Sequence, residues 1–90
     1  MTNSKEFELA ASLVKKLLQT PNNTELLYLY KYYKQATIGD NNVEKPPFYN
    51  VNDNAKWKAW DSLKGTSKHD SEVKYIQYVN ELLNKYGANV

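Results

Sequence analysis

The 90-residue chain contains no cysteine and no arginine, and its longest run of aliphatic residues is three, Leu9-Ala10-Ala11. Without cysteine, disulfide bonds, thiolate zinc sites and cysteine nucleophiles are excluded. A membrane-spanning helix needs about 20 consecutive apolar residues, so the sequence predicts none. No charged segment followed by an apolar stretch opens the chain, and we therefore expect no secretory signal. Together these absences predict a soluble, cytoplasmic protein.

All twelve basic residues are lysines, and ten acidic residues leave a net charge of only +2. Proteins that read duplex DNA use arginine forks on guanine edges, and this chain has none. Lysine instead binds phosphate as a point charge. Tyrosine is abundant, with eight residues in the chain, and each one combines an aromatic face with a hydroxyl group. The composition therefore points away from a reader of duplex DNA.

Four segments carry the 3.6-residue periodicity of amphipathic helices, and no period-2 alternation is long enough to compete. Helices are expected over Ser4–Leu18, from Asn23 or Thr24 to Ile38, over Asn52–Leu63, and from Ser67 to the stop at Gly87. The segment Gly39–Val51 contains a proline pair and an Asn/Gly cluster, which predict a long ordered loop. At this length, residues 1–90 make one domain, and its fold class is all-α.

Local patterns predict how the first helix begins and how the long loop is held. Asn3 and Glu6 resemble a capping box at the start of the first helix. Phe48 and Tyr49 are large apolar residues in the loop, and we expect them to attach it to the core. The residues expected to line the core are Phe7, Ala11, Val14 and Leu18 in the first helix and Tyr75, Val79, Leu82 and Tyr86 in the last.

The sequence offers no constellation of residues suited to catalysis. His69 is the only histidine, and we expect it to be a solvated residue in the first turn of the last helix. No Gly-x-Ser-x-Gly, Cys-His or HExxH pattern occurs. The carboxylates are scattered along the chain, so neither an acid pair nor a metal cluster is predicted. We therefore expect a protein that is not an enzyme and that needs no cofactor or metal.

The strongest candidate for a binding function is the tyrosine- and lysine-rich stretch Tyr30–Thr37 of the second helix. Positions 30, 33, 34 and 37 lie on one side of a helix, which would put Tyr30, Tyr33 and Lys34 on one surface. Tyrosine can stack on a base, a contact worth about 1–3 kcal/mol, while Lys34 neutralises a phosphate. The same pattern also fits large core tyrosines whose hydroxyls reach the surface, and periodicity leaves both interpretations open.

Three further positions are weaker candidates when taken singly. Lys56 lies on the polar flank of the third helix, Lys15 lies late in the first, and Tyr75 begins the apolar face of the last. Solvation, the helix dipole and core packing would each explain one of them. Together, lysines from three segments and tyrosines from two favour a compact anionic nucleotide. A single-stranded nucleic-acid binder and a helical protein-interaction module remain alternatives.

Three blocks of sequence carry a resemblance that covers nearly the whole chain. They are Tyr30-x-x-Tyr33-Lys34-Gln35-Ala36-Thr37-x-Gly39-Asp40, Ala55-Lys56-Trp57-x-Ala59-Trp60 and Leu63-Lys64-Gly65-Thr66-Ser67-Lys68. In these blocks the chain resembles the acyl-CoA-binding proteins, the small family also called diazepam-binding inhibitor in animals. The resemblance implies an up-down-down-up four-helix bundle, with its long loop between the second and third helices, and a bowl-shaped groove. It also implies tight binding of long-chain acyl-CoA thioesters without chemical conversion.

The resemblance further implies roles for particular residues at the head group of the ligand. Tyr30 and Tyr33 match family tyrosines that pack on the CoA head group, with Tyr33 against the adenine. Lys34 and Lys56 match the lysines that hold the 3′-phosphate. These four assignments are implied by the resemblance alone.

Three more residues and the partners of the protein follow from the same resemblance. Tyr75 matches the tyrosine near the ribose and adenine, and Lys15 matches the first-helix lysine that faces the head group. Leu26 stands where the family has an apolar residue near the acyl chain. The implied protein is a monomeric, cytoplasmic carrier of long-chain acyl-CoA that does not bind nucleic acid. Peripheral membrane contact during ligand delivery is part of this expectation.

Overall fold

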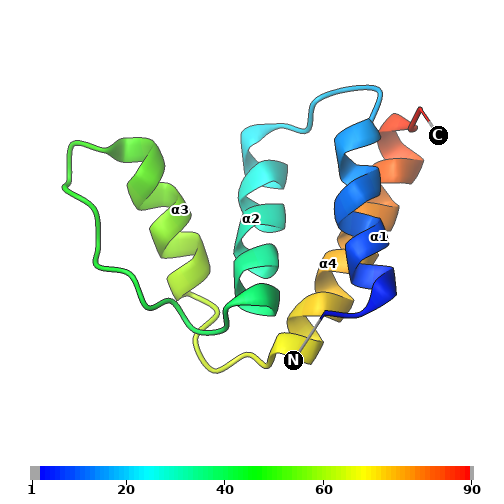
Figure 1. The fold of residues 1–90 in the computed structure, drawn as a ribbon. Coiled ribbons are helices and arrows are strands. Elements are labelled where there is room, and N and C mark those ends of the chain that lie inside the picture. The colour runs from blue at the N-terminus through cyan, green and yellow to red at the C-terminus, as the bar shows by residue number, and fades with distance from the viewer. Residues whose placement is uncertain (1–2, 90) are drawn as a thin grey trace.

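The computed structural model describes residues 3–89, which fold into four α-helices and one short 3₁₀ helix. The bounds are α1 Lys5–Leu13, η1 Val14–Lys16, α2 Asn23–Thr37, α3 Val51–Asp61 and α4 Lys68–Tyr86. The all-α four-helix prediction is confirmed. Figure 1 shows that α1 and α4 run in one direction and that α2 and α3 run in the other, which is the up-down-down-up arrangement.

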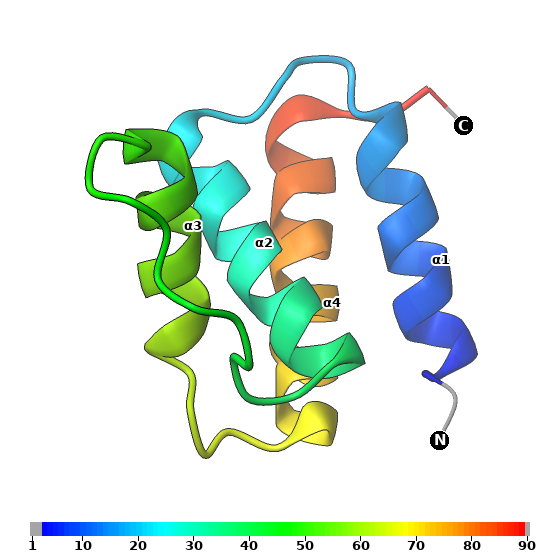
Figure 2. The ribbon, with the colours of Figure 1, turned by 60° about the vertical axis from the view of Figure 1, so that its left-hand side comes forward.

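The helices form a thin slab that measures 39 × 31 × 15 Å. Helix α4 packs against both α1 and α2, and α2 also packs against α3. The long loop leaves the end of α2 and returns along α3 to its start, so the two helices lie side by side and parallel (Figures 1 and 2). The two parallel helices α2 and α3, together with the loop, therefore form one edge of the slab.

The core lies where α4 meets α1 and α2. Tyr75, Val79 and Leu82 are buried along one face of α4, as the periodicity predicts. Burying a large apolar side chain stabilises a fold by about 1.5–3 kcal/mol, so this stripe supplies much of the stability of a small domain. The buried cluster consists of Phe7, Ala10, Leu29, Ala36, Tyr75, Val79 and Leu82.

The first helix is shorter than the periodicity predicts. Helix α1 ends at Leu13 and continues as a 3₁₀ helix only to Lys16. Leu17 then forms a β-bridge with Ala88, and the backbone N–H of Leu18 donates to the carbonyl of Gly87 at 3.0 Å. Leu18, expected in the core, is 64% exposed. Backbone pairing with the end of the chain therefore replaces the last turn of the expected helix.

The N-terminal cap of α1 is Ser4 rather than Asn3, so the expected capping box is wrong. The Oγ of Ser4 accepts a hydrogen bond from the backbone N–H of Phe7 at 3.1 Å. Asn3 instead donates from Nδ2 to the carbonyl of Ala36 at 3.0 Å and to Oε2 of Glu72 at 2.6 Å. The Asn3 side chain is therefore engaged across the bundle with α2 and α4 and is not available to cap its own helix.

The long loop is held by polar contacts to α3 and not by its own aromatic residues. The indole N–H of Trp60 donates to the carbonyl of Gly39 at 2.8 Å, and that of Trp57 donates to the carbonyl of Val43 at 2.7 Å. Phe48 is 90% exposed and Tyr49 is 70% exposed. The expectation that these two residues attach the loop to the core is therefore wrong, because the tryptophans of α3 already bind the loop backbone.

In the described part of the chain, every helix is too short or too polar to cross a membrane.

Candidate functional site

Two adjoining cavities lie along the α2–α3 edge of the slab. We call the first the lysine cavity; its volume is about 200 Å³, and it is lined by Tyr30, Lys34, Val43, Pro46, Asp53, Lys56, Trp57 and Trp60. We call the second the α2–α3 groove; its volume is about 420 Å³, and it is lined by Asn23, Leu26, Leu27, Tyr30, Asn52, Ala55 and Lys56. Tyr30 and Lys56 line both, so the two cavities lie next to each other.

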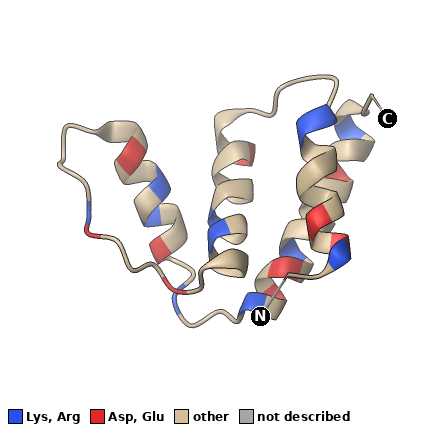
Figure 3. Ribbon diagram, in the orientation of Figure 1, with Lys and Arg blue, Asp and Glu red and all other residues tan. Residues whose placement is uncertain are grey.

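The lysine cavity brings together two ammonium groups from different helices. The Nζ of Lys34 lies 5.9 Å from the Tyr30 ring centroid and 5.5 Å from that of Trp60. The Nζ of Lys56 lies 5.8 Å from the same Tyr30 centroid. Figure 3 shows lysine segments on the neighbouring α2 and α3. The electron-rich ring faces attract both cations and so favour their positions before any ligand arrives.

The two lysines keep their hydrogen-bonding capacity for an external anion. Within residues 3–89, no carboxylate oxygen lies within 4.0 Å of the Nζ of Lys34 or Lys56. Asp53 is the carboxylate among the residues that line the cavity. An ammonium group has three donors and binds phosphate as a compact charge. The cavity is therefore suited to an anion that contacts both lysines.

The α2–α3 groove supplies an apolar surface directly beside these charges. Leu26 and Leu27 of α2 line one side, and Ala55 of α3 lines the other. Leu26 is 43% exposed, which leaves much of an aliphatic side chain in contact with water. The methyl side chain of Ala55 takes little space, which leaves room between the helices. The groove can therefore hold a hydrocarbon segment whose charged end lies at the lysines.

Tyr33 and Tyr75 form a second cluster, on the flank of α2 that faces α1 and α4. The Tyr33 ring stacks on Phe7 with centroids 5.6 Å apart and lies 5.8 Å from the ring of Tyr75. Burial, together with the neighbouring Tyr33 phenol, raises the pKa of Tyr75 to about 12. Tyr75 is therefore a neutral, packed phenol at physiological pH. Tyr33 is 42% exposed, so part of its ring remains open to a ligand.

The structure divides the single tyrosine surface that the helical spacing predicts. Tyr30 and Lys34 face α3, whereas Tyr33 packs on Phe7 of α1. Consecutive residues are about 100° apart around a helix, and α2 has neighbours on both sides. Adjacent positions such as 33 and 34 can therefore point to different neighbours.

Of the remaining predicted site residues, some line the α2–α3 site and others lie away from it. Leu26 lies in the α2–α3 groove, together with Tyr30 and Lys56. Lys15 is exposed in the 3₁₀ helix after α1 and is not among the residues that line the lysine cavity. The structure therefore brings four of the seven predicted residues into one site and places Tyr33, Tyr75 and Lys15 outside its lining.

Sequence reasoning missed several residues that line the site. Leu27 is the neighbour of Leu26, and Asn23 and Asn52 lie at the first turns of α2 and α3. Ala55 could have been found, because a small residue directly before Lys56 is suited to a helix face that must leave space. Within residues 3–89, no group of three or more histidine, aspartate or glutamate side chains is arranged to hold a metal ion.

Known proteins are similar to this chain over most of its length. Residues 4–79 match the family model described as Acyl CoA binding protein. The chain is 49% identical over 85 residues to Acyl-CoA-binding protein 2 of Saccharomyces pastorianus, which covers 94% of this chain and 98% of that protein. It is 48% identical over 82 residues to Acyl-CoA-binding protein homolog 1 of Caenorhabditis elegans, covering 91% and 95% respectively.

Two solved structures of acyl-CoA-binding proteins are similar to this chain in sequence and in fold. The crystal structure of Oryza sativa Acyl-CoA-Binding Protein 2 has a TM-score of 0.85 at 40% identity and covers 90% of each chain. The solution structure of the acyl coenzyme A binding protein from yeast has a TM-score of 0.77 at 48% identity, with coverage of 94% of this chain and 99% of that one. The match in sequence and in fold extends over nearly the whole molecule, and the chain belongs to the acyl-CoA-binding protein family.

Proposed function

We propose that the protein binds long-chain acyl-CoA thioesters and carries them without chemical conversion. The observation that supports this most directly is that the lysine cavity and the α2–α3 groove adjoin, because they share Tyr30 and Lys56. A ligand with a phosphorylated head and a hydrocarbon tail is complementary to such a pair of cavities. The two relatives described above are both named acyl-CoA-binding proteins.

Lys34 and Lys56 hold a phosphate of the head group between α2 and α3. A hydrogen bond to a charged group contributes about 1.5–3 kcal/mol, and here two such donors come from separate helices. Tyr33, whose side chain is 42% exposed, provides an aromatic surface for the adenine, with Tyr75 packed against it. Lys15 adds positive charge for the polyanionic head from the side of α1.

The acyl chain lies in the groove and supplies most of the affinity. Each buried methylene contributes about 0.8 kcal/mol, so a chain of many methylenes gains more than the head group does alone. Leu26, Leu27 and Ala55 provide the apolar contact. The head group then orients the ligand, and the length of the acyl chain sets how tightly it is held.

The protein acts as a monomeric carrier in the cytoplasm, and it exchanges its ligand at membrane surfaces. The absence of cysteine fits a reducing compartment. Neither a cofactor nor a nucleic acid is part of this function, because reversible binding of a thioester makes and breaks no covalent bond.

Titration calorimetry of palmitoyl-CoA, CoA and palmitate tests the proposal. We expect palmitoyl-CoA to bind far more tightly than either of its parts, because only the thioester fills both cavities. Palmitate binding as tightly as palmitoyl-CoA would instead indicate a general lipid carrier. A single-stranded oligonucleotide that displaces palmitoyl-CoA would favour a nucleic-acid binder. Sedimentation of the loaded protein as a dimer would contradict the monomer.

A further inference from the structure

The long loop presents two aromatic side chains to solvent. Phe48 and Tyr49, which we call the aromatic tip, are the large residues at the turn that precedes α3, and both are mostly exposed. Their rings pack edge to face, with centroids 5.6 Å apart and planes at 80°. The two rings contact each other and lie outside the core, so the tip is a local aromatic surface on the loop.

Hydrogen bonds fix the turn that carries the aromatic tip. The backbone N–H of Asn50 donates to the carbonyl of Pro47 at 3.0 Å, which closes a turn around Phe48 and Tyr49. The buried Asn54 side chain donates from Nδ2 to the same Pro47 carbonyl at 2.6 Å and to the carbonyl of Asn50 at 3.0 Å. The fold therefore holds these aromatic residues outward from α3 with a buried polar side chain.

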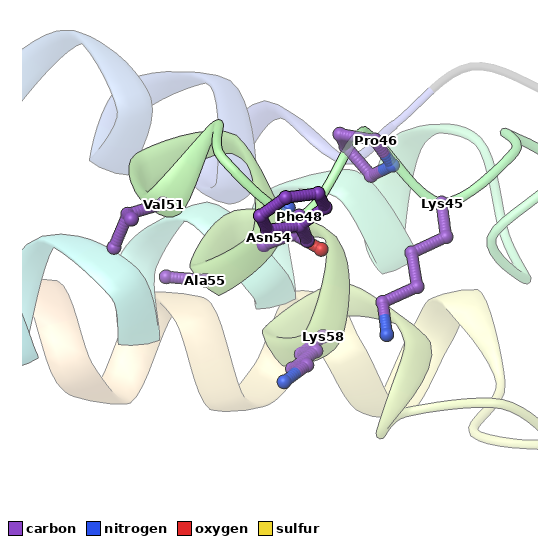
Figure 4. Close-up of a pocket in the computed structure, with 7 residues that line it drawn as sticks. All are labelled: Lys45, Pro46, Phe48, Val51, Asn54, Ala55 and Lys58. Carbon is purple, nitrogen blue, oxygen red and sulfur yellow. The ribbon is translucent and has the colours of Figure 1, made fainter.

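Lysines flank the aromatic tip. A cavity of about 580 Å³ beside it is lined by Lys45, Pro46, Phe48, Val51, Asn54, Ala55 and Lys58, none of which is acidic. Figure 4 shows that the side chains of Lys45 and Lys58 point in the same direction beside this cavity. Glu44 and Asp53 are the acidic residues nearest to the aromatic tip in the sequence. Their negative charges offset part of the positive charge of the lysines, so the attraction to anions is local and modest.

This combination of groups is complementary to the interface of a phospholipid bilayer. Aromatic rings are favoured at the level of the lipid head groups, and lysines interact with the lipid phosphates. A second copy of this chain is a poorer fit, because a stable protein interface buries about 800 Å² on each partner and involves 20 or more residues. The tip offers two aromatic side chains with Val51 beside them, which is enough to insert but too small for a stable dimer.

The aromatic tip is adjacent to the proposed ligand site. Ala55 lines both the cavity beside the tip and the α2–α3 groove, and Pro46 lines both that cavity and the lysine cavity. A membrane in contact with the tip would therefore lie close to the place where the acyl chain is held.

We propose that the aromatic tip, flanked by Lys45 and Lys58, docks on the surface of a phospholipid bilayer. Given the proposed function, docking in this orientation brings the α2–α3 groove to the membrane that acyl-CoA enters and leaves. Insertion of Phe48 and Tyr49 provides the apolar part of the binding. The two lysines provide the additional attraction to anionic lipids.

Flotation with lipid vesicles tests the docking directly. Vesicles of phosphatidylcholine, alone or mixed with phosphatidylserine, are incubated with the full chain and separated on a density gradient. We expect Phe48→Ser/Tyr49→Ser to lower the partition coefficient about tenfold or more on both compositions. Lys45→Gln/Lys58→Gln should remove the increase that phosphatidylserine gives. The matched controls are Leu9→Ser, at an exposed leucine of α1, and Lys74→Gln, at an exposed lysine of α4, and both should float like the unmodified protein.

Solution measurements separate a failure of this inference from a failure of the proposed function. Palmitoyl-CoA binding without vesicles should be unchanged in Phe48→Ser/Tyr49→Ser, and so should the midpoint of thermal unfolding. Equal flotation of the tip variant and the unmodified protein would overturn the docking, as would no flotation of either. Loss of both flotation and solution binding would show that the tip belongs to the ligand site. A dimer that dissociates in the tip variant would show that the tip is a protein interface. Failure of the unmodified protein to bind palmitoyl-CoA would refute the proposed function, while flotation would still report on the tip.

Discussion

Lys34 of α2 and Lys56 of α3 direct their ammonium groups at the same aromatic ring, with nitrogen atoms 5.9 Å and 5.8 Å from the Tyr30 centroid. Like charges gathered around one ring repel each other, and a group of opposite sign beside them reduces this repulsion. The face of Tyr30 offsets part of this repulsion. A bound phosphate would remove the rest, so the arrangement gains stability when an anion binds.

Replacing either lysine should therefore weaken the binding of palmitoyl-CoA. For Lys34→Ala or Lys56→Ala, we expect affinity to fall by about 10–100-fold, the range for one hydrogen bond to a charged group. The affinity of each variant should also depend less on salt. Calorimetry at two salt concentrations measures both effects. The control is Lys74→Ala, at an exposed lysine of α4.

A double-mutant cycle shows whether the two lysines act on one group. If both contact the same phosphate, the double variant should lose less than the sum of the single losses, with a coupling energy of about 0.5–3 kcal/mol. Additive losses would contradict a shared phosphate, even if each lysine matters by itself.

Tyr30 should act on the ligand through the lysines that its ring supports. Tyr30→Leu removes the ring from both ammonium groups, and each such contact is worth about 0.5–1 kcal/mol at an exposed site. We expect a loss of about 5–30-fold in palmitoyl-CoA affinity. Tyr30→Phe keeps the ring and should bind nearly as the unmodified protein does. A large loss in the phenylalanine variant would show that the hydroxyl group contacts the ligand instead.

The helices of this fold could be predicted from sequence because burial follows their periodicity. Tyr75, Val79 and Leu82 recur at helical spacing on one face of α4, and all three are buried. The end of α1 could not be predicted in the same way. Its last turn is replaced by backbone pairing of Leu17 with Ala88, a contact between distant parts of the chain that leaves no local pattern.

The sequence could identify residues of the site but not their arrangement in space. Sequence reasoning identified Lys34 and Lys56 as phosphate-binding candidates, but their approach to one Tyr30 ring depends on the parallel packing of α2 and α3. The position of the long loop could not be predicted from the sequence either. Its attachment depends on the indole N–H groups of Trp57 and Trp60, whereas a hydrophobicity pattern favours Phe48.

Trp60 should stabilise the fold through its indole N–H as well as through burial. The group donates to the carbonyl of Gly39 at 2.8 Å, and the side chain is buried. Trp60→Phe leaves this carbonyl without its partner, and we expect unfolding in urea to show a loss of about 1–3 kcal/mol. Tyr49→Phe changes an exposed ring and serves as the control. An unchanged free energy of unfolding would mean that water replaces the indole at Gly39.

Tyr75 should make the stability of the protein depend on alkaline pH. Its pKa is raised from 10.0 to about 12, chiefly because burial disfavours the phenolate. The folded state therefore holds this proton more tightly than the unfolded state, and the resulting stability is complete below pH 10 and lost as the pH rises towards 12. Absorbance of the phenolate should show a late ionisation step that Tyr75→Phe removes. Persistence of that step in the variant would assign it to another tyrosine.

Glu25 should produce the opposite dependence at acidic pH. Its carboxylate accepts hydrogen bonds from the Tyr86 hydroxyl at 2.6 Å, from the Nζ of Lys85 at 2.9 Å and from the backbone N–H of Asn22 at 2.9 Å. These bonds, with that of Tyr86 the strongest, lower the pKa of Glu25 from 4.5 to about 2. A lowered pKa means that the folded state favours the ionised carboxylate, so its contribution is complete above pH 4.5 and disappears as the pH falls towards 2.

Thermal unfolding of Glu25→Gln between neutral and acidic pH measures this contribution. The variant should be less stable than the unmodified protein at neutral pH, because a neutral amide has one acceptor oxygen in place of two and has no charge to pair with Lys85. The difference should shrink as the pH falls towards 2, where the carboxylate of the unmodified protein is itself protonated. Glu44→Gln, at an exposed position in the long loop, should leave the unfolding curve unchanged. A constant difference between Glu25→Gln and the unmodified protein at every pH would mean that Glu25 stabilises the helix ends by packing and not by its charge.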